Sequence, residues 1–307
     1  MADTLYSDLS DSRLSEVLAA EIDMLLADRM YLWGHPALMY VGDASGSGSS
    51  TIKTPQVGLG GYDEMASAAD GAAVSGTVIT DASATVAVAR YALAREISDL
   101  ARLTDSTGKI NVSGLAADMV ASAHAAFTTS IAALGSGFSS SVGTSGSDLS
   151  VDNFFSAVLT LELANVATGP NWVAVLHSQQ IGDLRASLRS ESGVLEHSPA
   201  TAETVQRTGQ QSAGTLLGVD ILRSNRVPTA NAGADRAGFM FGKSAIYWAD
   251  AAVPGVPGLP GQIAPGGRIS VDIGRDELSA MTNIVGNYFF GTSEGQDGAG
   301  VGIITDA

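Results

Sequence analysis

Two stretches of the chain place apolar side chains at the spacing of an α-helix. In residues 112–134 the large apolar residues fall on one stripe, and most other positions hold alanine or another small residue. A second stripe, in residues 11–32, has acidic residues on its other face and Asp11 or Ser12 as possible N-caps. These patterns predict a long helix of about 33 Å and an amphipathic N-terminal helix. The N-terminal helix could pack on its own domain or dock on a neighbouring subunit, and the pattern does not choose between them.

Alternating patterns predict strands on both sides of these helices. Residues 50–59 and 73–91 alternate small, β-branched and polar side chains around a turn-rich stretch from Gly60 to Gly71, which predicts a long hairpin. Because the hairpin has few large apolar side chains, it cannot build its own core and should lie on another surface. An ordinary sheet edge is the alternative. Near the C-terminus, residues 268–273 alternate in the same way and predict another strand.

Helical and strand patterns alternate after the Gly/Ser-rich segment 135–150, which marks a domain boundary. Such alternation predicts a compact α/β unit. Its expected helices span 151–165 and 178–189, and its expected strands span 171–177, 218–224 and 238–250. The segments 190–215 and 253–267 predict long loops on this unit.

A charged cluster leads into an apolar run near the C-terminus. Asp272, Asp276 and Glu277 interleave with Arg268 and Arg275, which predicts a surface ion-pair network rather than a catalytic carboxylate pair. The run that follows holds no reactive group, and we expect its large apolar side chains to be buried: Met281, Ile284, Val285, Tyr288, Phe289 and Phe290.

Composition narrows the classes of function. With 307 residues, 45% of them hydrophobic, the chain is long enough for about two domains. It carries 16 basic against 32 acidic residues, so its charge of -16 argues against a surface that grips nucleic-acid phosphates. Only 16% of residues are charged, which favours burial against partners in an oligomer. No apolar run reaches about 18 residues and no signal peptide is recognisable, which predicts a soluble chain made in the cytoplasm.

Motifs for catalysis or cofactor binding are missing or incomplete. Gly242, Lys243 and Ser244 end like a phosphate-binding loop, but Ala237 stands where the loop needs a glycine. The chain has no cysteine, and its histidines have neither metal spacing nor a nearby acid. They are His35, His124, His177 and His197. We therefore predict no enzymatic activity, no cofactor and no metal.

Four segments carry a family resemblance: VAVLHSQQIGDLRASLRSESG (173–193), LLGVDILRSNRVP (216–228), FMFGKSAIYWAD (239–250) and GRDELSAMTNIVGNYFFG (274–291). RYALAREISDLARL, which follows the predicted hairpin, adds to them. In order and spacing they resemble the HK97-type major capsid protein of tailed bacteriophages, over nearly the whole chain. The resemblance implies an α+β fold whose parts are an N-arm (1–45), an extended E-loop hairpin (46–90), a peripheral domain with a long spine helix (91–147 and 268–307) and an α/β axial domain (148–267).

The resemblance also implies function and partners. Copies of the chain would form the hexamers and pentamers of an icosahedral shell around phage DNA, assembled in the host cytoplasm and found in the virion. Expected partners are a portal and a separate scaffolding protein, since the arm begins almost at Met1 and a scaffolding segment is either separate or removed; decoration proteins are a further expectation. The candidate intersubunit contacts are Leu18, Ile22, Leu25, Lys53, Tyr62, Arg90, Arg275 and Glu277.

Two alternatives stay open beside this interpretation, and covalent crosslinking is a separate question. An encapsulin-like nanocompartment shell has the same fold and would enclose cargo enzymes instead of DNA. An α/β hydrolase-like enzyme centred on His177 and residues 148–267 would need a nucleophile motif that the chain lacks. Covalent crosslinking, known in one branch of the family, needs an E-loop lysine and a peripheral asparagine. Lys53 lies at the base of the loop, and the asparagine would be Asn283 or Asn287, so crosslinking is not expected.

Overall fold

The computed structural model of the chain describes residues 32, 35–45, 48–56, 67, 70, 82–100, 112–164, 171–190, 212–252 and 269–306. Four predicted features lie wholly or largely outside these residues: the N-terminal helix, the hairpin tip and the two long loops. The contacts predicted at Leu18, Ile22, Leu25 and Tyr62 are among them and stay predictions.

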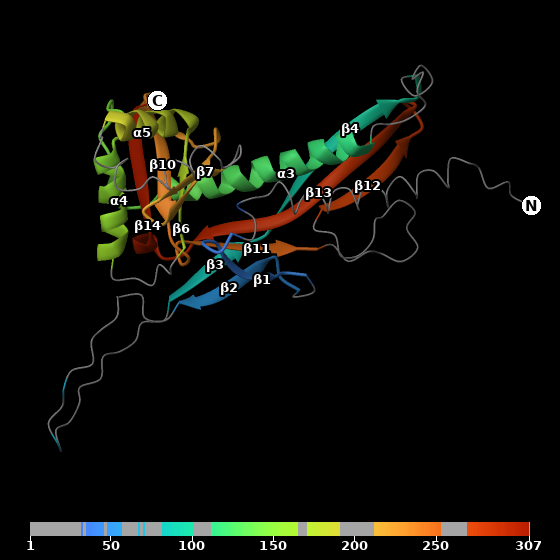
Figure 1. Cartoon of the computed structure of the whole chain (residues 1–307). Coiled ribbons are helices and arrows are strands. Elements are labelled where there is room, and N and C mark those ends of the chain that lie inside the picture. The colour runs from blue at the N-terminus through green and yellow to red at the C-terminus, as the bar shows by residue number, and fades with distance from the viewer. Residues whose placement is uncertain are drawn as a thin grey trace, which may run out of the picture.

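The first sheet, called here the spine sheet, is built around β13 (Met281–Glu294). β4 (Ala89–Ser98) pairs antiparallel with one edge of β13. The other edge pairs first with β12 (Ile269–Asp276) and then with β11 (Ile246–Ala251). β1 (Met39–Asp43) adds to β11 in parallel. The result is a long, narrow sheet (Figure 1).

A single long helix, α3 (Val112–Gly135), runs along one face of the spine sheet (Figure 1). Phe127 and Ile131 on its inner stripe are completely buried in the core that it shares with the sheet. The helix approaches β13 closely because Gly286 has no side chain; a Cβ there would lie 3.1 Å from the sulfur of Met119. The helix predicted at 112–134 is confirmed.

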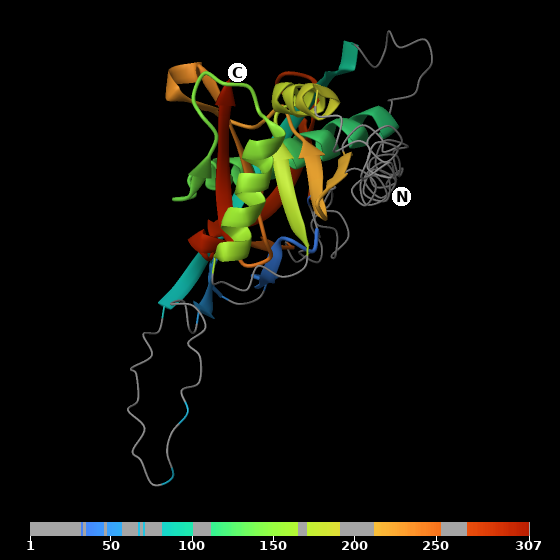
Figure 2. The ribbon, with the colours of Figure 1, turned by 60° about the vertical axis from the view of Figure 1, so that its left-hand side comes forward.

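A seven-stranded sheet forms the other part of the molecule (Figure 2). Its strand order is β5 (Ser141–Val142), β14 (Gly300–Asp306), β10 (Asp235–Phe241), β6 (Trp172–Leu176), β8 (Val219–Arg223) and β7 (Ser212–Leu216), with β9 (Thr229–Ala230) also beside β10. Two helices, α4 (Val151–Leu163) and α5 (Ser178–Ser190), pack on this sheet, and single 3₁₀ turns lie at Asn231–Gly233 and Asp297–Ala299. The predicted α/β unit is therefore present, with its helices and strands close to the expected bounds.

One predicted strand of this unit is wrong. Residues 238–250 form two strands, because a turn at Gly242, closed by the Ala245 N–H donating to its carbonyl at 3.1 Å, separates β10 from β11. β10 lies in the seven-stranded sheet and β11 in the spine sheet. β14 joins the seven-stranded sheet although its residues fall in the range predicted for the peripheral domain. The two sheets therefore do not follow the predicted domain ranges at β11 and at β14. The ranges themselves remain a prediction.

The apolar run of β13 is only partly buried under α3. Ile284, Tyr288 and Phe290 are almost wholly inaccessible, whereas Val285 and Phe289 are half-buried. Successive side chains of a strand point to opposite faces, and only one face of the spine sheet is covered by the helix. The expectation that every large side chain of this run is buried is therefore wrong for Val285, Phe289 and Met281, which lies on the same uncovered face.

The base of the predicted hairpin is a two-stranded ladder of β2 (Thr51–Gln56) and β3 (Ala82–Ala87). It has a small core, because Val86 is completely buried in a cluster with Tyr247 of β11. The predicted strand at 73–91 is divided, since β3 ends at Ala87 and β4 begins at Ala89. The hairpin base thus lies on another surface, as expected, and that surface belongs to the same chain.

Candidate assembly surfaces

His177 and Lys243, which were considered for chemistry, lie in ordinary structural settings, and His197 lies outside the described residues. His177 follows β6, and its Nδ1 accepts a hydrogen bond from the Gln179 N–H at 3.3 Å, at the start of α5. Partial burial, with the nearby charge of Arg236, lowers the pKa of His177. Lys243 lies in the turn between β10 and β11, not in a phosphate loop. In the described part of the chain, no group of three or more His, Asp or Glu residues could hold a metal ion, and no helix has the length and apolarity to span a membrane.

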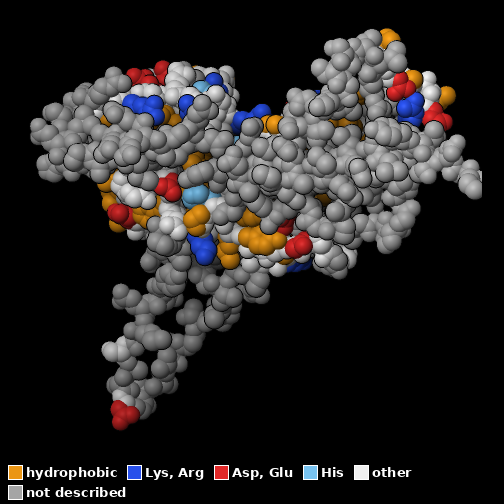
Figure 3. Space-filling model, turned by 45° about the vertical axis from the view of Figure 1, so that its right-hand side comes forward, with side chains coloured by type: hydrophobic (Ala, Val, Ile, Leu, Met, Phe, Trp, Pro, Cys, Tyr) orange, Lys and Arg blue, Asp and Glu red, His pale blue; other side chains and the backbone are white. Residues whose placement is uncertain are grey.

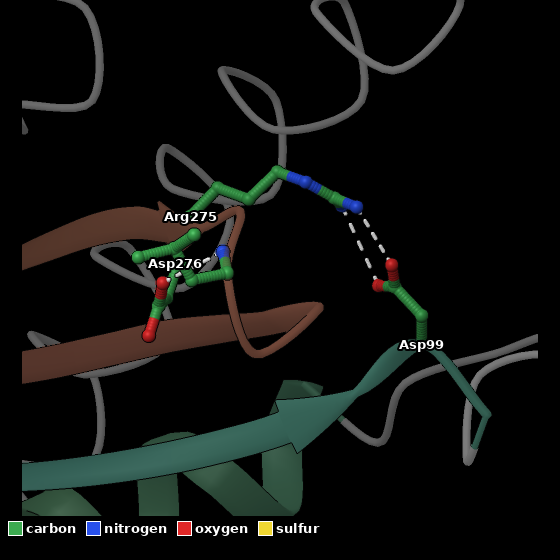
Figure 4. Close-up of polar contacts among 4 residues, drawn as sticks. Asp99, Arg275 and Asp276 are labelled. Atoms are coloured by element: carbon green, nitrogen blue, oxygen red, sulfur yellow. Dashed lines mark hydrogen bonds and ion pairs between the residues drawn. The ribbon is translucent and has the colours of Figure 1, made fainter.

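The free tip of the spine sheet carries two of the predicted contacts. Arg275, at the end of β12, forms an ion pair with Asp99 at 2.6 Å (Figure 4). Asp276 instead holds the turn that follows, because it accepts hydrogen bonds from the Ser279 hydroxyl at 2.6 Å and the Leu278 N–H at 3.0 Å. These bonds, led by that from Ser279, lower the pKa of Asp276. Glu277 is exposed in the same turn.

This geometry corrects the predicted ion-pair network. The partner of Arg275 is Asp99, which lies far away in the sequence, and not the acidic residues beside it. The tip also exposes apolar surface: Leu278 is fully exposed, and Leu100 is 70% exposed. The tip therefore combines an ion pair with exposed apolar side chains.

A chain of hydrogen bonds crosses the face of the spine sheet that α3 leaves uncovered. Arg90 on β4 donates through Nε to the Asn287 side-chain oxygen at 2.8 Å. Asn287 on β13 donates in turn to Asp272 on β12, also at 2.8 Å. Because Asn287 is only 3% exposed and its amide is occupied on both sides, it is held in place by β4 and β12. Lys53, on β2 opposite Thr85, is exposed, and no contact between it and either asparagine is seen.

The opposite face of β4 is tied to α3. Arg95 forms an ion pair with Asp118 of the helix at 2.6 Å, and Tyr91 stacks on Phe290 with ring centroids 4.2 Å apart. Beside these contacts lies a cavity of about 120 Å³ under the helix, lined mainly by apolar side chains and by Gly286. Sequence reasoning missed Asp99 and Asp118 as partners, since both contacts join distant segments and no local spacing indicates them.

A pair of carboxyl groups lies where the chain passes from the spine sheet to the seven-stranded sheet. Glu294 ends β13, and Asp297 accepts a hydrogen bond from the Ser139 N–H at 2.9 Å. Burial, a hydrogen bond to Asp297 and the charge of that residue raise the pKa of Glu294. Burial acts to raise the pKa of Asp297 too, but hydrogen bonds from Ser139 and Glu294 lower it overall. Of the two acids, Glu294 is therefore the one that more readily keeps its proton, and Asp297 is the one that more readily ionises.

On the described part of the face in Figure 3, a group of apolar side chains lies with single acidic and basic side chains near it. On α4, Leu159 and Leu163 lie one turn apart and are 53% and 75% exposed. An exposed pair at this spacing forms a short apolar ridge on the helix. The described surface thus carries apolar residues on both parts of the molecule.

Solved structures with the same fold include bacteriophage structures and an encapsulin. A chain from a structure of Mycobacterium phage Che8 matches with a TM-score of 0.59 and 18% identity, over 84% of this chain and 85% of that one. A chain from the capsid of cyanophage Pam1 gives a TM-score of 0.59 and 13% identity, over 91% and 93%. The holo-SrpI encapsulin complex from Synechococcus elongatus gives 0.57 and 12%, over 89% and 86%.

No family model matches the chain, and no curated protein matches it. The structural matches cover most of both chains at low identity, so they establish the fold. The HK97-type α+β fold predicted from the sequence is confirmed: this chain has the architecture found in phage capsids and in an encapsulin shell.

Proposed function

We propose that the chain is a major capsid protein, whose copies form the hexamers and pentamers of an icosahedral shell around phage DNA. The observation that carries this proposal is the match to phage capsid structures over most of both chains. Physical features support it. The edge strand β4 is largely exposed, the tip of the spine sheet exposes Leu278, and the β2–β3 ladder extends from the body (Figure 2). A subunit with such surfaces gains most by burying them against copies of itself.

Within this proposal the two sheets take different places. Most of the seven-stranded sheet, with α4 and α5, would lie in the axial domain (148–267), near the centre of each capsomer. The spine sheet with α3 would be the peripheral domain (91–147 and 268–307), reaching towards neighbouring capsomers. The segments 1–45 and 46–90 would be the N-arm and the E-loop.

The remaining partners follow from the same proposal. A portal, a separate scaffolding protein and decoration proteins would bind the shell, which would assemble in the host cytoplasm and remain in the virion. The chain would enclose DNA without gripping it, since its net charge of -16 repels phosphates. No catalytic step is needed for this role.

An encapsulin-like shell is the second candidate, because the SrpI encapsulin matches with a TM-score of 0.57, close to the 0.59 of the phage structures. The contents of the particles separate the two. Shells isolated from their native source would contain DNA if the chain is a phage capsid protein and an enzyme cargo if it is a nanocompartment.

Expression of the unmodified chain alone, followed by electron microscopy and analytical ultracentrifugation, tests the shared step of assembly. We expect closed shells or isolated capsomers. A protein that sediments as a stable monomer at micromolar concentration would refute both candidates, and an esterase screen on that monomer would then examine the hydrolase alternative at His177.

A further inference from the structure

The strand β4 is paired along one edge only. Its 10 residues pair with β13 from end to end, and no other strand of the described ranges lies along its opposite edge. Most of its side chains are exposed, which is unusual for a strand of this length inside a domain. A long, exposed edge strand offers unpaired backbone groups to another chain. The side chains of β4 indicate which strand could pair with this edge.

The charges of β4 are arranged symmetrically about its middle. Arg90 lies three residues before Leu93, and Glu96 lies three residues after it. Arg90 and Glu96 therefore share one face of the sheet. In an antiparallel pair of two β4 strands centred on Leu93, Arg90 of each copy would stand directly opposite Glu96 of the other. Ala92 would stand opposite Ala94, so no bulky side chain intervenes. Opposite charges in directly opposed positions stabilise a strand pair.

Neighbouring registers lack this match. Moving the centre by one residue towards the N-terminus places Arg90 opposite Ala94 of the second copy, and moving it the other way places Arg90 opposite Ser98. The register centred on Leu93 also brings Arg95 of one copy beside Tyr91 of the other, where a guanidinium can lie against an aromatic ring.

We propose that the β4 edges of two copies pair antiparallel about a two-fold axis at Leu93 and so join two spine sheets into one. The proposal rests on the shell assembly proposed above, because an icosahedral shell contains two-fold axes at which such a self-complementary contact can form. Main-chain hydrogen bonds would supply affinity, and the Arg90–Glu96 pairs would fix the register.

The helices leave room for this contact. The close approach of Met119 to Gly286 centres α3 over β13, one strand away from the free edge of β4. The two copies of α3 would then lie three strand spacings apart, or about 14 Å, which exceeds the 8–10 Å between packed helices. The ion pair of Arg95 with Asp118 lies on this face and holds α3 to β4.

Single cysteines test the register, since the chain has no cysteine of its own. Directly opposed residues have Cα atoms about 4.5–5.5 Å apart, within the range of a disulfide. Assembled particles of Leu93→Cys should therefore form a disulfide-linked dimer on mild oxidation. Ala92→Cys and Ala94→Cys should each crosslink poorly alone, because a residue and its own copy would then be about 8 Å apart. Co-assembled in one particle, they should crosslink to each other.

Copies of Ala92→Cys and Ala94→Cys with tags of different length identify the mixed dimer by its mass. A mixed dimer in excess of both self-dimers supports the proposed register. No dimer in Leu93→Cys particles and none in the mixed particles would overturn the proposal, as would equal crosslinking of all three single variants. Because the mixed experiment does not alter Leu93, a folding defect of Leu93→Cys leaves the test intact.

Charge reversal tests the energetics. Glu96→Arg would place an introduced arginine opposite Arg90 twice in each contact, and we expect about tenfold fewer particles at a fixed concentration. Glu96→Gln, the neutral control, should lose less. Arg90→Glu combined with Glu96→Arg restores opposite charges and should recover assembly to within about twofold of the unmodified chain. No recovery, or no loss with Glu96→Arg, would contradict the pairing.

Different experimental outcomes would refute the β4 contact and the proposed shell function. Particles that form normally but never show the crosslink refute the β4 contact alone. An unmodified chain that forms no particles refutes the shell, and the β4 contact with it.

Discussion

The two sheets differ in how fully the chain itself buries them. In the seven-stranded sheet, Val175 and Phe239 point into one core together with α3, while Leu176 and Met240 point into another with α4 and α5. The spine sheet has α3 on one face and the β2–β3 ladder against part of the other, and along β4 most side chains are exposed. Sheets buried on both faces stand as complete units, whereas a sheet with a long exposed edge strand is open to partners. The contrast teaches that the chain buries the seven-stranded sheet on both faces and leaves the β4 edge of the spine sheet exposed.

The largest effect should come from a charge placed under α3. Ile284→Asp buries a carboxylate with no partner beneath the helix, which costs about 4 kcal/mol or more. Against a total stability of about 5–15 kcal/mol, this should leave little folded protein. Phe289→Asp, on the opposite face of the same strand, where the side chain is only half-buried, should cost only about 1 kcal/mol. Urea unfolding of both variants measures the difference, and equal losses would show that the two faces are buried alike.

An added methyl group should be costly at Gly238 of the seven-stranded sheet and harmless at Gly274 near the tip of the spine sheet. A Cβ at Gly238 would lie 2.6 Å from the Gln180 side-chain oxygen, and Gln180 is held by bonds to Thr305 and to the His177 N–H. Gly238→Ala should therefore cost about 2 kcal/mol. Gly274→Ala on β12 meets nothing within 4 Å and should change stability by less than about 0.5 kcal/mol. Thermal unfolding compares them; a harmless Gly238→Ala would mean that the Gln180 site can open.

A smaller effect is expected from the ion pair between β4 and α3. Arg95 and Asp118 have half-exposed side chains, so their coupling should be about 0.5 kcal/mol. A double-mutant cycle with Arg95→Ala and Asp118→Ala at low salt measures it, and repeating the cycle at about 0.5 M salt should reduce it. A coupling that exceeds about 2 kcal/mol would indicate that this pair is buried by a neighbour.

The smallest effect concerns pH at the corner between the sheets. The pKa of Glu294 is raised in the folded protein, so its contribution to stability is fully present below the unfolded pKa of about 4.3 and is lost as pH rises through the folded pKa. The pKa of Asp297 is lowered, so its own contribution persists in this range. Glu294→Gln keeps a hydrogen-bond donor and cannot ionise. Relative to the unmodified chain, it should gain stability between about pH 4.5 and pH 7.

Unfolding free energies at both pH values provide the measurement. A difference between variant and unmodified chain that does not change with pH would mean that folding does not raise the pKa of Glu294. Glu277→Gln, in the exposed turn of the spine sheet, is the matched control.

Local periodicity predicted the three described helices and some of the strands of both sheets. The stripe at 112–134 and the alternation at 268–273 each reflect a single buried face, and the structure forms α3 and β12 there. The run at 238–250 misled because its two strands are both buried, so the apolar pattern continues through the turn at Gly242. Periodicity reports burial, and it cannot report which sheet buries a residue.

The candidate surfaces were predictable only in part. Arg90 and Arg275 were singled out from the sequence, but their partners Asn287 and Asp99 lie almost 200 residues away and depend on strand pairing. Glu96 has no local signal until the register of β4 is known. Contacts with Leu18, Ile22 and Tyr62 stay predictions, since these residues lie outside the described ranges.

The length of β13 has a mechanical consequence. Its 14 residues span about 47 Å, and the strand passes directly into the corner that leads to β14. Hydrogen bonds of an antiparallel ladder stand perpendicular to the strands. A force along β13 therefore acts in shear on all its hydrogen bonds with β4 and β12 at once. A force across the sheet would break these bonds one after another. We therefore expect the molecule to resist extension best along the line that joins its tip to its body.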